Sequence, residues 1–280
     1  MSENLPEMLT IRESPTLEGA TLVLAFAGWM DGGDVSTGTV NRLVHLLDAH
    51  PIAEIDSEPF YIFNFPGSME IAALFRPQVD IEEGLIQKVV MPTNTFFACA
   101  TANLVLFIGK EPNLRWRTFG ECIVAMARRV GVRRILFVGS FGGSVPHTRQ
   151  PRLHVNASDA ALLAELKPFG MRLSNYSGPG SFTTYLLTQA ESAGLEMVSL
   201  MAEIPSYLQG PNLSSIEAVT RRLAKLLKVP LDLATLRSAS TKWELEVSGA
   251  VEQDKDLAKT VRELEDAYDN ELLDLDAEET

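Results

Sequence analysis

Short apolar runs alternate with helically spaced segments between about residue 20 and residue 201. The runs are rich in Val, Ile, Leu and Phe, which is typical of strands buried on both faces of a sheet. In the segments between them, apolar residues recur three or four positions apart, as at Phe119, Ile123 and Met126, and predict helices. The alternation predicts a layered α/β domain. The clearest strands are expected at residues 21–27, 88–91, 104–108, 134–138 and 196–201.

The pattern changes after residue 211, where the strand-like runs stop. Apolar residues at helical spacing follow, behind a Ser214-x-x-Glu217 sequence that matches a capping box. We therefore expect an α/β domain over residues 1–210 and a helical C-terminal extension over residues 211–280.

A second apolar stripe runs from Trp243 to Leu275 in steps of three and four residues, and it predicts one long amphipathic helix. Such a helix can pack on its own domain, on a copy of the chain, or on a separate partner. Residues 269–280 carry six acidic side chains and no basic one. Repulsion between these carboxylates is expected to fray the end of the helix.

Charge is distributed unevenly along the 280 residues. The formal net charge is −13, of which residues 252–280 contribute −9. The rest of the chain is mildly acidic, and therefore lacks the surplus of Lys and Arg that neutralises phosphates. A nucleic-acid partner is not expected.

The longest apolar runs are far shorter than the roughly 20 residues that a membrane span requires. The N-terminal segment also lacks the pattern of a signal peptide. Cys99 and Cys122 form neither a disulfide framework nor a metal-binding motif. We expect a cytoplasmic protein that does not associate with a membrane.

A glycine-rich turn follows the first predicted strand and precedes a predicted helix. Such a turn presents backbone N–H groups and a helix N-terminus, which attract anions. Its acids, Asp31 and Asp34, would repel a phosphate unless a cation intervened, and Asp34 is alternatively the N-cap of the helix. The candidate ligand-binding residues in this turn are Gly28, Asp31, Gly32 and Gly33.

A second glycine turn is expected after the strand at residues 134–138. The side chains of His147, Thr148 and Arg149 offer a titratable ring, a hydroxyl and a fixed cation, which fit a general base or an anion clamp. The alternative is a loop in which these side chains hold backbone groups in place. The candidate residues in this turn are Ser140, Gly142, Gly143, His147, Thr148 and Arg149.

Two further turns contribute Gly178, ahead of a predicted helix, and Glu203, at the end of the last strand. Glu203 could bond to a ligand hydroxyl or pair with an arginine. The carboxyl ends of parallel strands meet at one edge of an open α/β sheet, so we expect these turns to form one ligand-binding crevice. The spacing of the His, Cys, Asp and Glu residues predicts neither a metal site nor a catalytic set, and no cofactor is expected.

Six segments of the chain carry a further signal through their order and spacing. They are residues 28–34 (GWMDGGD), 106–112 (LFIGKEP), 145–149 (VPHTR), 176–179 (YSGP), 204–208 (IPSYL) and 261–268 (VRELEDAY). Taken together, they resemble the PAC2 family of proteasome-assembly-chaperone-like proteins, over about residues 10–270. The resemblance implies a three-layer domain related to the nucleoside phosphorylases, with a central mixed, largely parallel sheet, a helical C-terminal extension and a tendency to self-associate.

The better-understood members of this family are non-catalytic chaperones that dock on proteasome α-subunits. The resemblance therefore implies a protein-interaction role, with copies of the chain and proteasome α-subunits as partners. Two departures bear on this expectation. Related docking chaperones can end in a hydrophobic-tyrosine-any tripeptide, whereas this chain ends in Glu278-Glu279-Thr280, and Ser206 stands where related sequences often have a histidine.

The alternative is a small-molecule binding protein or enzyme that uses the crevice for a nucleoside or a phosphate ester. Residues 139–143 are similar to the glycine turn of nucleoside phosphorylases, and residues 201–203 are similar to their ribose-binding segment. By this resemblance, Ser140 would contact phosphate and Glu203 would contact a sugar hydroxyl.

Overall fold

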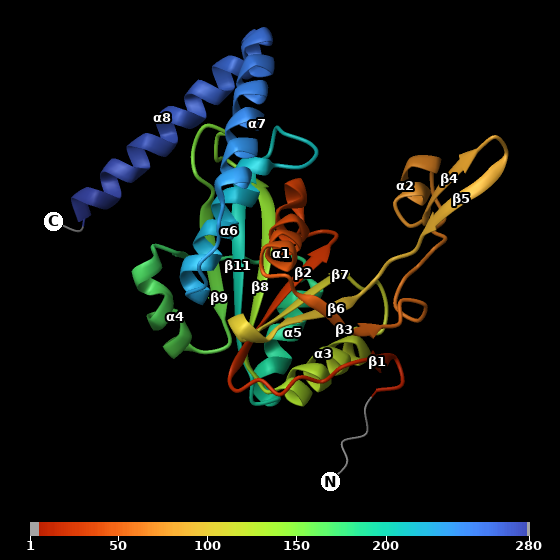
Figure 1. Ribbon diagram of the computed structural model, residues 1–280. Coiled ribbons are helices and arrows are strands. Elements are labelled where there is room, and N and C mark those ends of the chain that lie inside the picture. Colours follow the sequence, from red (N-terminus) through yellow and green to blue (C-terminus); the bar gives the residue numbers. More distant parts are fainter. Residues whose placement is uncertain (1–5, 279–280) are drawn as a thin grey trace.

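A mixed β-sheet forms the centre of the molecule in the computed structural model, which describes residues 6–278, with side chains through Leu273 (Figure 1). Its middle strands run parallel in the order β7, β2, β8, β11. On one side the antiparallel strands β6, β3 and β1 extend the sheet, and on the other side β9 pairs antiparallel with β11 and parallel with β10. The strands of this sheet are β1 (Leu9–Ile11), β2 (Ala20–Ala27), β3 (His50–Ile55), β6 (Thr95–Cys99), β7 (Leu104–Lys110), β8 (Val132–Gly143), β9 (Arg152–Ala157), β10 (Arg172–Leu173) and β11 (Glu196–Pro205).

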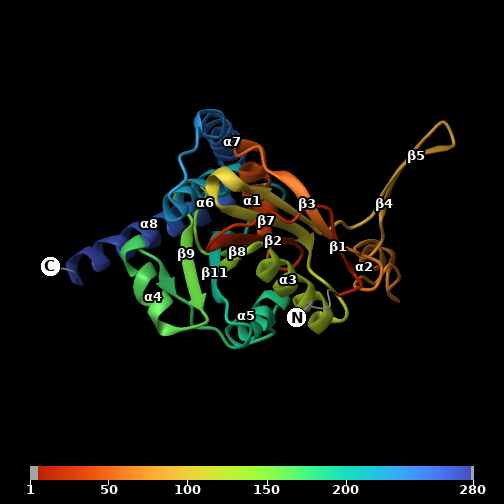
Figure 2. The same ribbon diagram turned by 60° about the horizontal axis from the view of Figure 1, so that its bottom comes forward.

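Helices cover both faces of the sheet, with α1 and α6 on one side and α3 and α5 on the other (Figure 2). Side chains along β2 alternate between the two layers because successive residues of a strand point to opposite faces. Leu24 and Phe26 belong to the core under α3 and α5, whereas Val23 and Ala25 belong to the core under α1 and α6. The helices of the two layers are α1 (Val35–Leu46), α3 (Trp116–Val130), α4 (Ala160–Leu166), α5 (Phe182–Ser192) and α6 (Leu213–Leu227). The predicted three-layer α/β fold with a largely parallel sheet is confirmed.

A cluster of aromatic rings fills the core between the sheet and the layer of α3 and α5. Phe119 on α3 lies 5.3 Å from Phe182 on α5, 6.1 Å from Phe26 on β2 and 4.9 Å from Phe60, measured between ring centroids. All four side chains are buried. Such tilted and edge-to-face contacts stabilise a core beyond the simple burial of area.

The chain after Pro205 forms three helices, and the first of them belongs to the main body. Ile216, Val219 and Leu223 on α6 are buried in the core under α1. The predicted capping box is wrong, because α6 begins two residues earlier than Ser214 as N-cap would require, at Leu213. Its N-cap is Asn212, whose side chain accepts a hydrogen bond from Ser215 N at 2.9 Å.

The prediction of one long helix after Trp243 is also wrong. The chain forms α7 (Ala234–Gln253) and α8 (Lys255–Glu278), which are separated at Asp254. Asp254 has extended backbone angles, and its carboxylate accepts hydrogen bonds from Asp256 N and Leu257 N, both at 3.1 Å. This N-cap begins a new helix in a new direction, although the apolar stripe continues across it.

Residues 64–91 form an arm that projects from the body between β3 and β6 (Figures 1 and 2). The arm contains the short helix α2 (Met69–Ala73) and a hairpin of β4 (Gln78–Glu82) and β5 (Leu85–Val90). Every residue of β4 and β5 is exposed. The expectation that residues 88–91 form a buried strand is therefore wrong, because this strand pairs with β4 outside the main sheet.

Short 3₁₀ turns complete the described secondary structure, at Gly32–Asp34 (η1), Ala100–Ala102 (η2) and Lys167–Phe169 (η3). None of the helices within residues 6–278 combines the length and the apolarity that a membrane span needs.

Replacing Phe119 by Ala should remove the central ring of the aromatic cluster. We expect the free energy of unfolding to fall by about 3–5 kcal/mol, because the substitution loses apolar burial and leaves a cavity. Urea denaturation followed by circular dichroism measures this change. Leu245→Ala on α7, where the side chain is 69% exposed, is the control and should change the free energy by no more than about 0.5 kcal/mol. A loss of similar size in both variants would contradict the assignment of Phe119 to the core.

Candidate functional site

The first two glycine turns meet at the carboxyl ends of β2 and β8, as their positions at strand ends predict. Asp31 and Ser140 form a parallel bridge, in which Ser140 N donates to Met30 O at 2.8 Å. The hydroxyl of Ser140 donates to Gly32 O at 2.7 Å, and its side chain is fully buried. The Ser140 hydroxyl therefore holds the first turn against β8.

Gly33 closes this turn against the start of α6. Its φ of +61° lies in the left-handed region that favours glycine. Its carbonyl accepts a hydrogen bond from Asn212 N at 2.8 Å, and a Cβ at this position would lie 2.9 Å from the Asn212 Cβ. A side chain at residue 33 would push α6 away from the turn.

Asp31, and not Asp34, uses its carboxylate to stabilise the beginning of α1. Its oxygens accept hydrogen bonds from Thr37 N at 3.1 Å and from the Thr37 hydroxyl at 2.7 Å. Burial raises the pKa of Asp31 to about 6, against the opposing effect of the bonds from Thr37. Asp34 stands at the N-cap position with a left-handed φ of 52°, and its side chain makes no capping hydrogen bond. Asp34 is therefore the N-cap residue of α1, as the alternative expected, but the carboxylate that bonds to the first turn of the helix belongs to Asp31.

Glu203 lies beside Gly143 on the neighbouring strand and forms ion pairs within the body. One carboxylate oxygen accepts a hydrogen bond from Ser144 N at 2.8 Å and lies 3.5 Å from Arg152, and the other oxygen lies 3.3 Å from His154 Nε2. A Cβ on Gly143 would collide with the Glu203 side chain. The structure thus matches the alternative in which Glu203 pairs with an arginine.

His147 joins the body to α7 through both of its ring nitrogens. Its Nδ1 lies 2.7 Å from the Tyr207 hydroxyl, and its Nε2 lies 3.1 Å from the Ser248 hydroxyl on α7. Because the Tyr207 oxygen already accepts the His147 backbone N–H at 2.9 Å, the hydroxyl proton of Tyr207 is directed to Nδ1. The neutral ring with its proton on Nε2 fits this arrangement.

Thr148 and Arg149 bind α8. The hydroxyl of Thr148 donates to the Glu265 carboxylate. Arg149 makes a two-pronged pair with Asp269, with Nε at 2.8 Å and Nη2 at 2.7 Å from the carboxylate oxygens. Parallel hydrogen bonds of this kind fix orientation as well as charge.

Two more arginines and a tyrosine, none of which the sequence analysis singled out, complete this contact. Arg152 and Arg172 each lie 2.6 Å from a different oxygen of Glu271. The Tyr268 hydroxyl donates to Gln150 O at 3.0 Å, and the Arg152 guanidinium lies 4.5 Å from the centre of the Tyr268 ring. We call the set of Arg149, Arg152 and Arg172 with Glu265, Tyr268, Asp269 and Glu271 the clasp. The surplus of acidic residues after residue 252 was the feature of the sequence that could have indicated the clasp.

The clasp also explains why α8 continues through the acidic segment. Arg149 lowers the pKa of Asp269 by hydrogen bonding to it. Burial works against ionisation of Glu271, but the bonds and charges of Arg172 and Arg152 outweigh it and lower its pKa. The expectation that the helix frays from residue 269 is therefore wrong up to Glu278, where the described helix ends. The remainder of the expected frayed end, residues 279 and 280, lies outside the described residues.

Gly28 and Gly178 lie apart from the clasp. Gly28 is next to Glu111, whose carboxylate accepts a hydrogen bond from Phe182 N at the beginning of α5. Gly178 lies in an exposed loop beside Tyr176. Gly142, between Ser140 and Gly143, lies on β8 close to Ser206. The structure thus brings most of the candidate residues together at one edge, where His147, Thr148 and Arg149 are bonded to α7 or α8. Asp31, Ser140 and Glu203 are bonded to other parts of the body.

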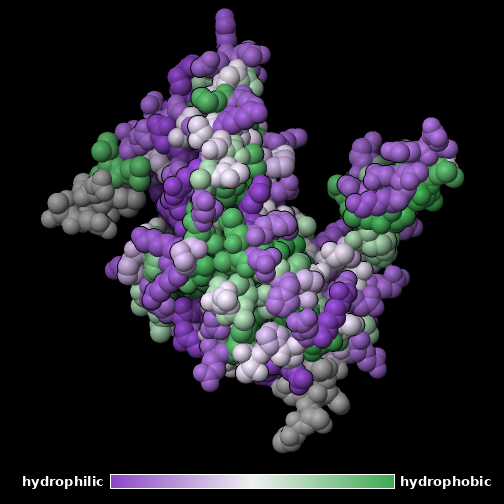
Figure 3. All heavy atoms as spheres, in the orientation of Figure 1, coloured by the Kyte–Doolittle hydropathy of each residue, from purple (hydrophilic) through white to green (hydrophobic). Residues whose placement is uncertain are grey.

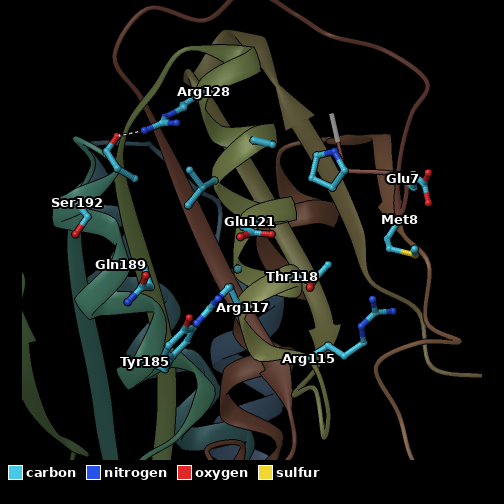
Figure 4. A pocket seen from close by; sticks show the side chains of 15 residues that line it. Glu7, Met8, Arg115, Arg117, Thr118, Glu121, Arg128, Tyr185, Gln189 and Ser192 are labelled. Carbon is cyan, nitrogen blue, oxygen red and sulfur yellow. Dashed lines mark hydrogen bonds between the residues drawn. The ribbon is translucent and has the colours of Figure 1, made fainter. Parts of the chain in front are cut away.

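The two cavities described for this chain are lined by other residues. The larger, of about 780 Å³, lies over the outer side of α3, between α5 and residues 6–8 (Figure 4). The smaller, of about 270 Å³, lies at the opposite ends of the parallel strands, near Gly19 and Asn103. Among the described residues, no group of three or more His, Cys, Asp and Glu side chains is placed to hold a metal ion. Ligand binding by the predicted crevice residues stays a prediction.

Comparison with known proteins shows which family model and which solved structures this chain matches. The sequence model of the PAC2 family matches residues 25–251. A proteasome-assembly chaperone homologue from Mycobacterium tuberculosis is 29% identical, with a TM-score of 0.73 over 86% of this chain and 99% of that chain. A PAC2 family protein from Streptomyces avermitilis is 28% identical, with a TM-score of 0.72 over 86% of this chain and 99% of that chain.

An archaeal proteasome activator from Pyrococcus furiosus shares the fold at 16% identity, with a TM-score of 0.65 over 86% of this chain and 97% of that chain. No curated protein matches this chain at a significant level.

Replacing Arg149 by Met should loosen α8 without unfolding the body. The pair with Asp269 is exposed to solvent, so we expect its loss to weaken docking of α8 only modestly. Hydrogen exchange of the amides of residues 255–273 should then be about two- to fivefold faster. Arg262→Met, an exposed position on α8 itself, is the control and should leave exchange unchanged. Equal exchange in Arg149→Met and the unaltered chain would show that the clasp does not hold α8.

The stability of the protein should depend on pH through His147. Burial lowers the pKa of His147, with Glu265 opposing this effect in part. As the pH falls below about 6.5, the unfolded chain takes up a proton that the folded protein resists. The stabilisation that His147 contributes is therefore complete above that pH, and it is lost as the pH falls toward the folded-state pKa of His147. Over this range the free energy of unfolding should fall by at most about 1.4 kcal/mol per pH unit. Urea denaturation between pH 7.5 and pH 5 measures it, and the His147→Gln variant should lack this part of the slope. Identical slopes for the two proteins would exclude this role.

Proposed function

Because this chain belongs to the PAC2 family, we propose that it is a non-catalytic protein-interaction factor of the proteasome-assembly-chaperone type. It would act by associating with copies of itself and with proteasome α-subunits. The M. tuberculosis homologue of proteasome-assembly chaperones, at 29% identity over nearly all of its own length, supports this assignment. The archaeal proteasome activator adds support at the level of the fold.

The observation that carries the proposal is that side chains of the predicted crevice bind other parts of the same chain. His147 is bonded to α7, Thr148 and Arg149 are bonded to α8, and Glu203 is paired with Arg152. Of the polar groups that a small-molecule site would need for its ligand, those of His147, Thr148 and Arg149 hold the C-terminal helices instead. Ser140 likewise donates its hydroxyl proton to Gly32 O rather than toward a phosphate site.

The edge of the sheet is therefore built to seat α7 and α8 on the body. Because these contacts fix the orientation of the two helices on the body, the outer faces of the helices are presented to a partner in a defined direction. Leu245 on α7 and Leu272 and Leu273 on α8 are exposed. We infer that these outer faces belong to the surface that meets other proteins.

Affinity purification from native cells tests the proposed function. A tagged chain, analysed by quantitative mass spectrometry, should enrich proteasome α-subunits well above a tag-only control. Arg149→Met, which loosens α8, should reduce that enrichment, whereas Arg42→Met, at an exposed position on α1, should not. Failure to enrich α-subunits in cells that express them would contradict the proteasome part of the proposal.

The small-molecule alternative is tested separately on the purified chain. Binding of a ligand to the folded state raises Tm. The proposal therefore expects no rise in Tm with inorganic phosphate or with adenosine. A rise that disappears in Ser140→Ala or Glu203→Gln would favour a ligand site in the crevice.

A further inference from the structure

The smaller of the two cavities, at the amino ends of the central strands, is separate from the clasp and from the predicted crevice. Its volume is about 270 Å³, and none of the described residues that line it belongs to either of those two sets. It lies on the face of the body that α1 and α6 cover, and Figure 3 shows hydrophobic residues gathered in the middle of that face, below α7. Voids larger than a water molecule are few in a well-packed protein. A cavity of this size is therefore a candidate binding site.

Four adjacent strands of the sheet form the floor of this cavity. Thr21 on β2 pairs with Leu104 on β7 and with Arg134 on β8, and Leu136 on β8 pairs with Val198 on β11. Leu104, Leu136 and Val198 belong to the core under α1 and α6, so their side chains lie on the same face of the sheet. The floor is therefore mainly apolar, and the Thr21 hydroxyl adds one hydrogen-bonding group to it.

The walls come from the ends of two helices. Leu166 lies at the end of α4, and Leu226 and Leu227 form the end of α6. The amides of residues 228 and 229 bond back to earlier carbonyls of α6, and Pro230 has no N–H to donate. The last carbonyls of α6, at Leu226 and Leu227, therefore keep positions at which they can accept a hydrogen bond.

The mouth of the cavity is held in place by the loops that precede β2 and β7. The Asn103 side chain donates to Glu18 O at 2.9 Å, and Thr21 N donates to Asn103 O at 3.4 Å. A Cβ on Gly19 would have no atom within 4 Å, so the mouth is open at this residue. A site that is already formed in this way requires little ordering when a ligand binds.

The charges around the cavity balance one another. Of the described residues that line it, only Arg134 is charged. Its Nε donates to Glu196 at 2.7 Å, and its two Nη atoms donate to Glu165 at 2.8 and 2.7 Å. Glu196 also pairs with Arg133 at 3.1 Å. The hydrogen bonds from Arg134 lower the pKa of Glu165, and the charges of Arg133 and Lys228 add to this effect. The partial negative charge at the end of α6 opposes that of Lys228. These surroundings favour an uncharged ligand.

We propose that this cavity binds a small, uncharged molecule with an apolar body of about two fused rings and one N–H or O–H donor. The apolar body lies on Leu104, Leu136 and Val198, and the donor bonds to the last carbonyls of α6 or to the Thr21 hydroxyl. A cavity of about 150 Å³ is enough for benzene, so 270 Å³ accommodates a second ring. The proposal goes beyond the proposed function, and it requires neither a proteasome nor catalysis.

Titration of the full chain with indole, followed by NMR of the Ile, Leu and Val methyl groups, tests the proposal. Indole has two fused rings, one N–H and no charge. The methyl signals of Leu136 and Val198 should shift, with a Kd of about 1 mM or lower, as expected for a ligand of this size. Benzoate, an anion without a donor, should bind at least about tenfold more weakly. Shifts confined to the arm, no shifts at all, or equal affinities for indole and benzoate would each overturn the proposal.

A variant that fills the cavity provides a second test. Ala102 is half-buried at the rim, in η2. Ala102→Trp should place an indole ring of the chain itself in the cavity and raise the Kd for free indole by about tenfold or more, with an unchanged circular dichroism spectrum. Ala250→Trp, at an exposed position on α7, is the matched control and should leave the Kd unchanged. An unchanged Kd in a folded Ala102→Trp variant would contradict the proposal. The NMR titration uses the unaltered chain, so it decides the question even if this variant does not fold.

Discussion

The parallel strands β7, β2, β8 and β11 are covered by helices on both faces, and this burial constrains the rest of the structure. Their side chains alternate between two apolar cores, so the strands themselves carry little polar chemistry. Polar residues are instead gathered where the strands end, and the carboxyl ends of parallel strands meet at one edge. The turns after β2 and β8 and the end of β11 are joined there by hydrogen bonds of Ser140 and Glu203.

In related architectures such an edge is a natural place for a ligand, but this chain seats two of its own helices there. The clasp neutralises part of a strongly acidic segment with three arginines of the body, and His147 bonds to α7 at the same place. Glu265, Asp269 and Glu271 of the acidic segment therefore complement the charge of the body. Away from this edge, most of the large apolar side chains that the described residues expose lie on the arm, and others lie on α7 and α8.

The sequence predicts the layers well because two-sided burial leaves a clear pattern in each central strand. It also predicts that the turns after residues 27 and 138 converge, because strand direction alone determines that edge. The clasp could not be predicted, since Arg149 and Asp269 are far apart in the chain and many acids could have served as partners. The arm was missed because an apolar run at residues 88–91 has the same composition whether it is buried or exposed. The break at Asp254 was missed because the apolar residues keep the same spacing of three and four positions on both sides of it.

The distance along the chain between the two halves of the clasp has a consequence for biosynthesis. Thr148, Arg149 and Arg152 are bonded to residues that follow 117 to 120 positions later. Because translation proceeds from the N-terminus and domains tend to fold as units while it continues, the sheet and its covering helices can assemble before α8 leaves the ribosome. The arginines at the strand ends then remain solvated until their carboxylates emerge, and this edge of the nascent protein is completed only when α8 is released.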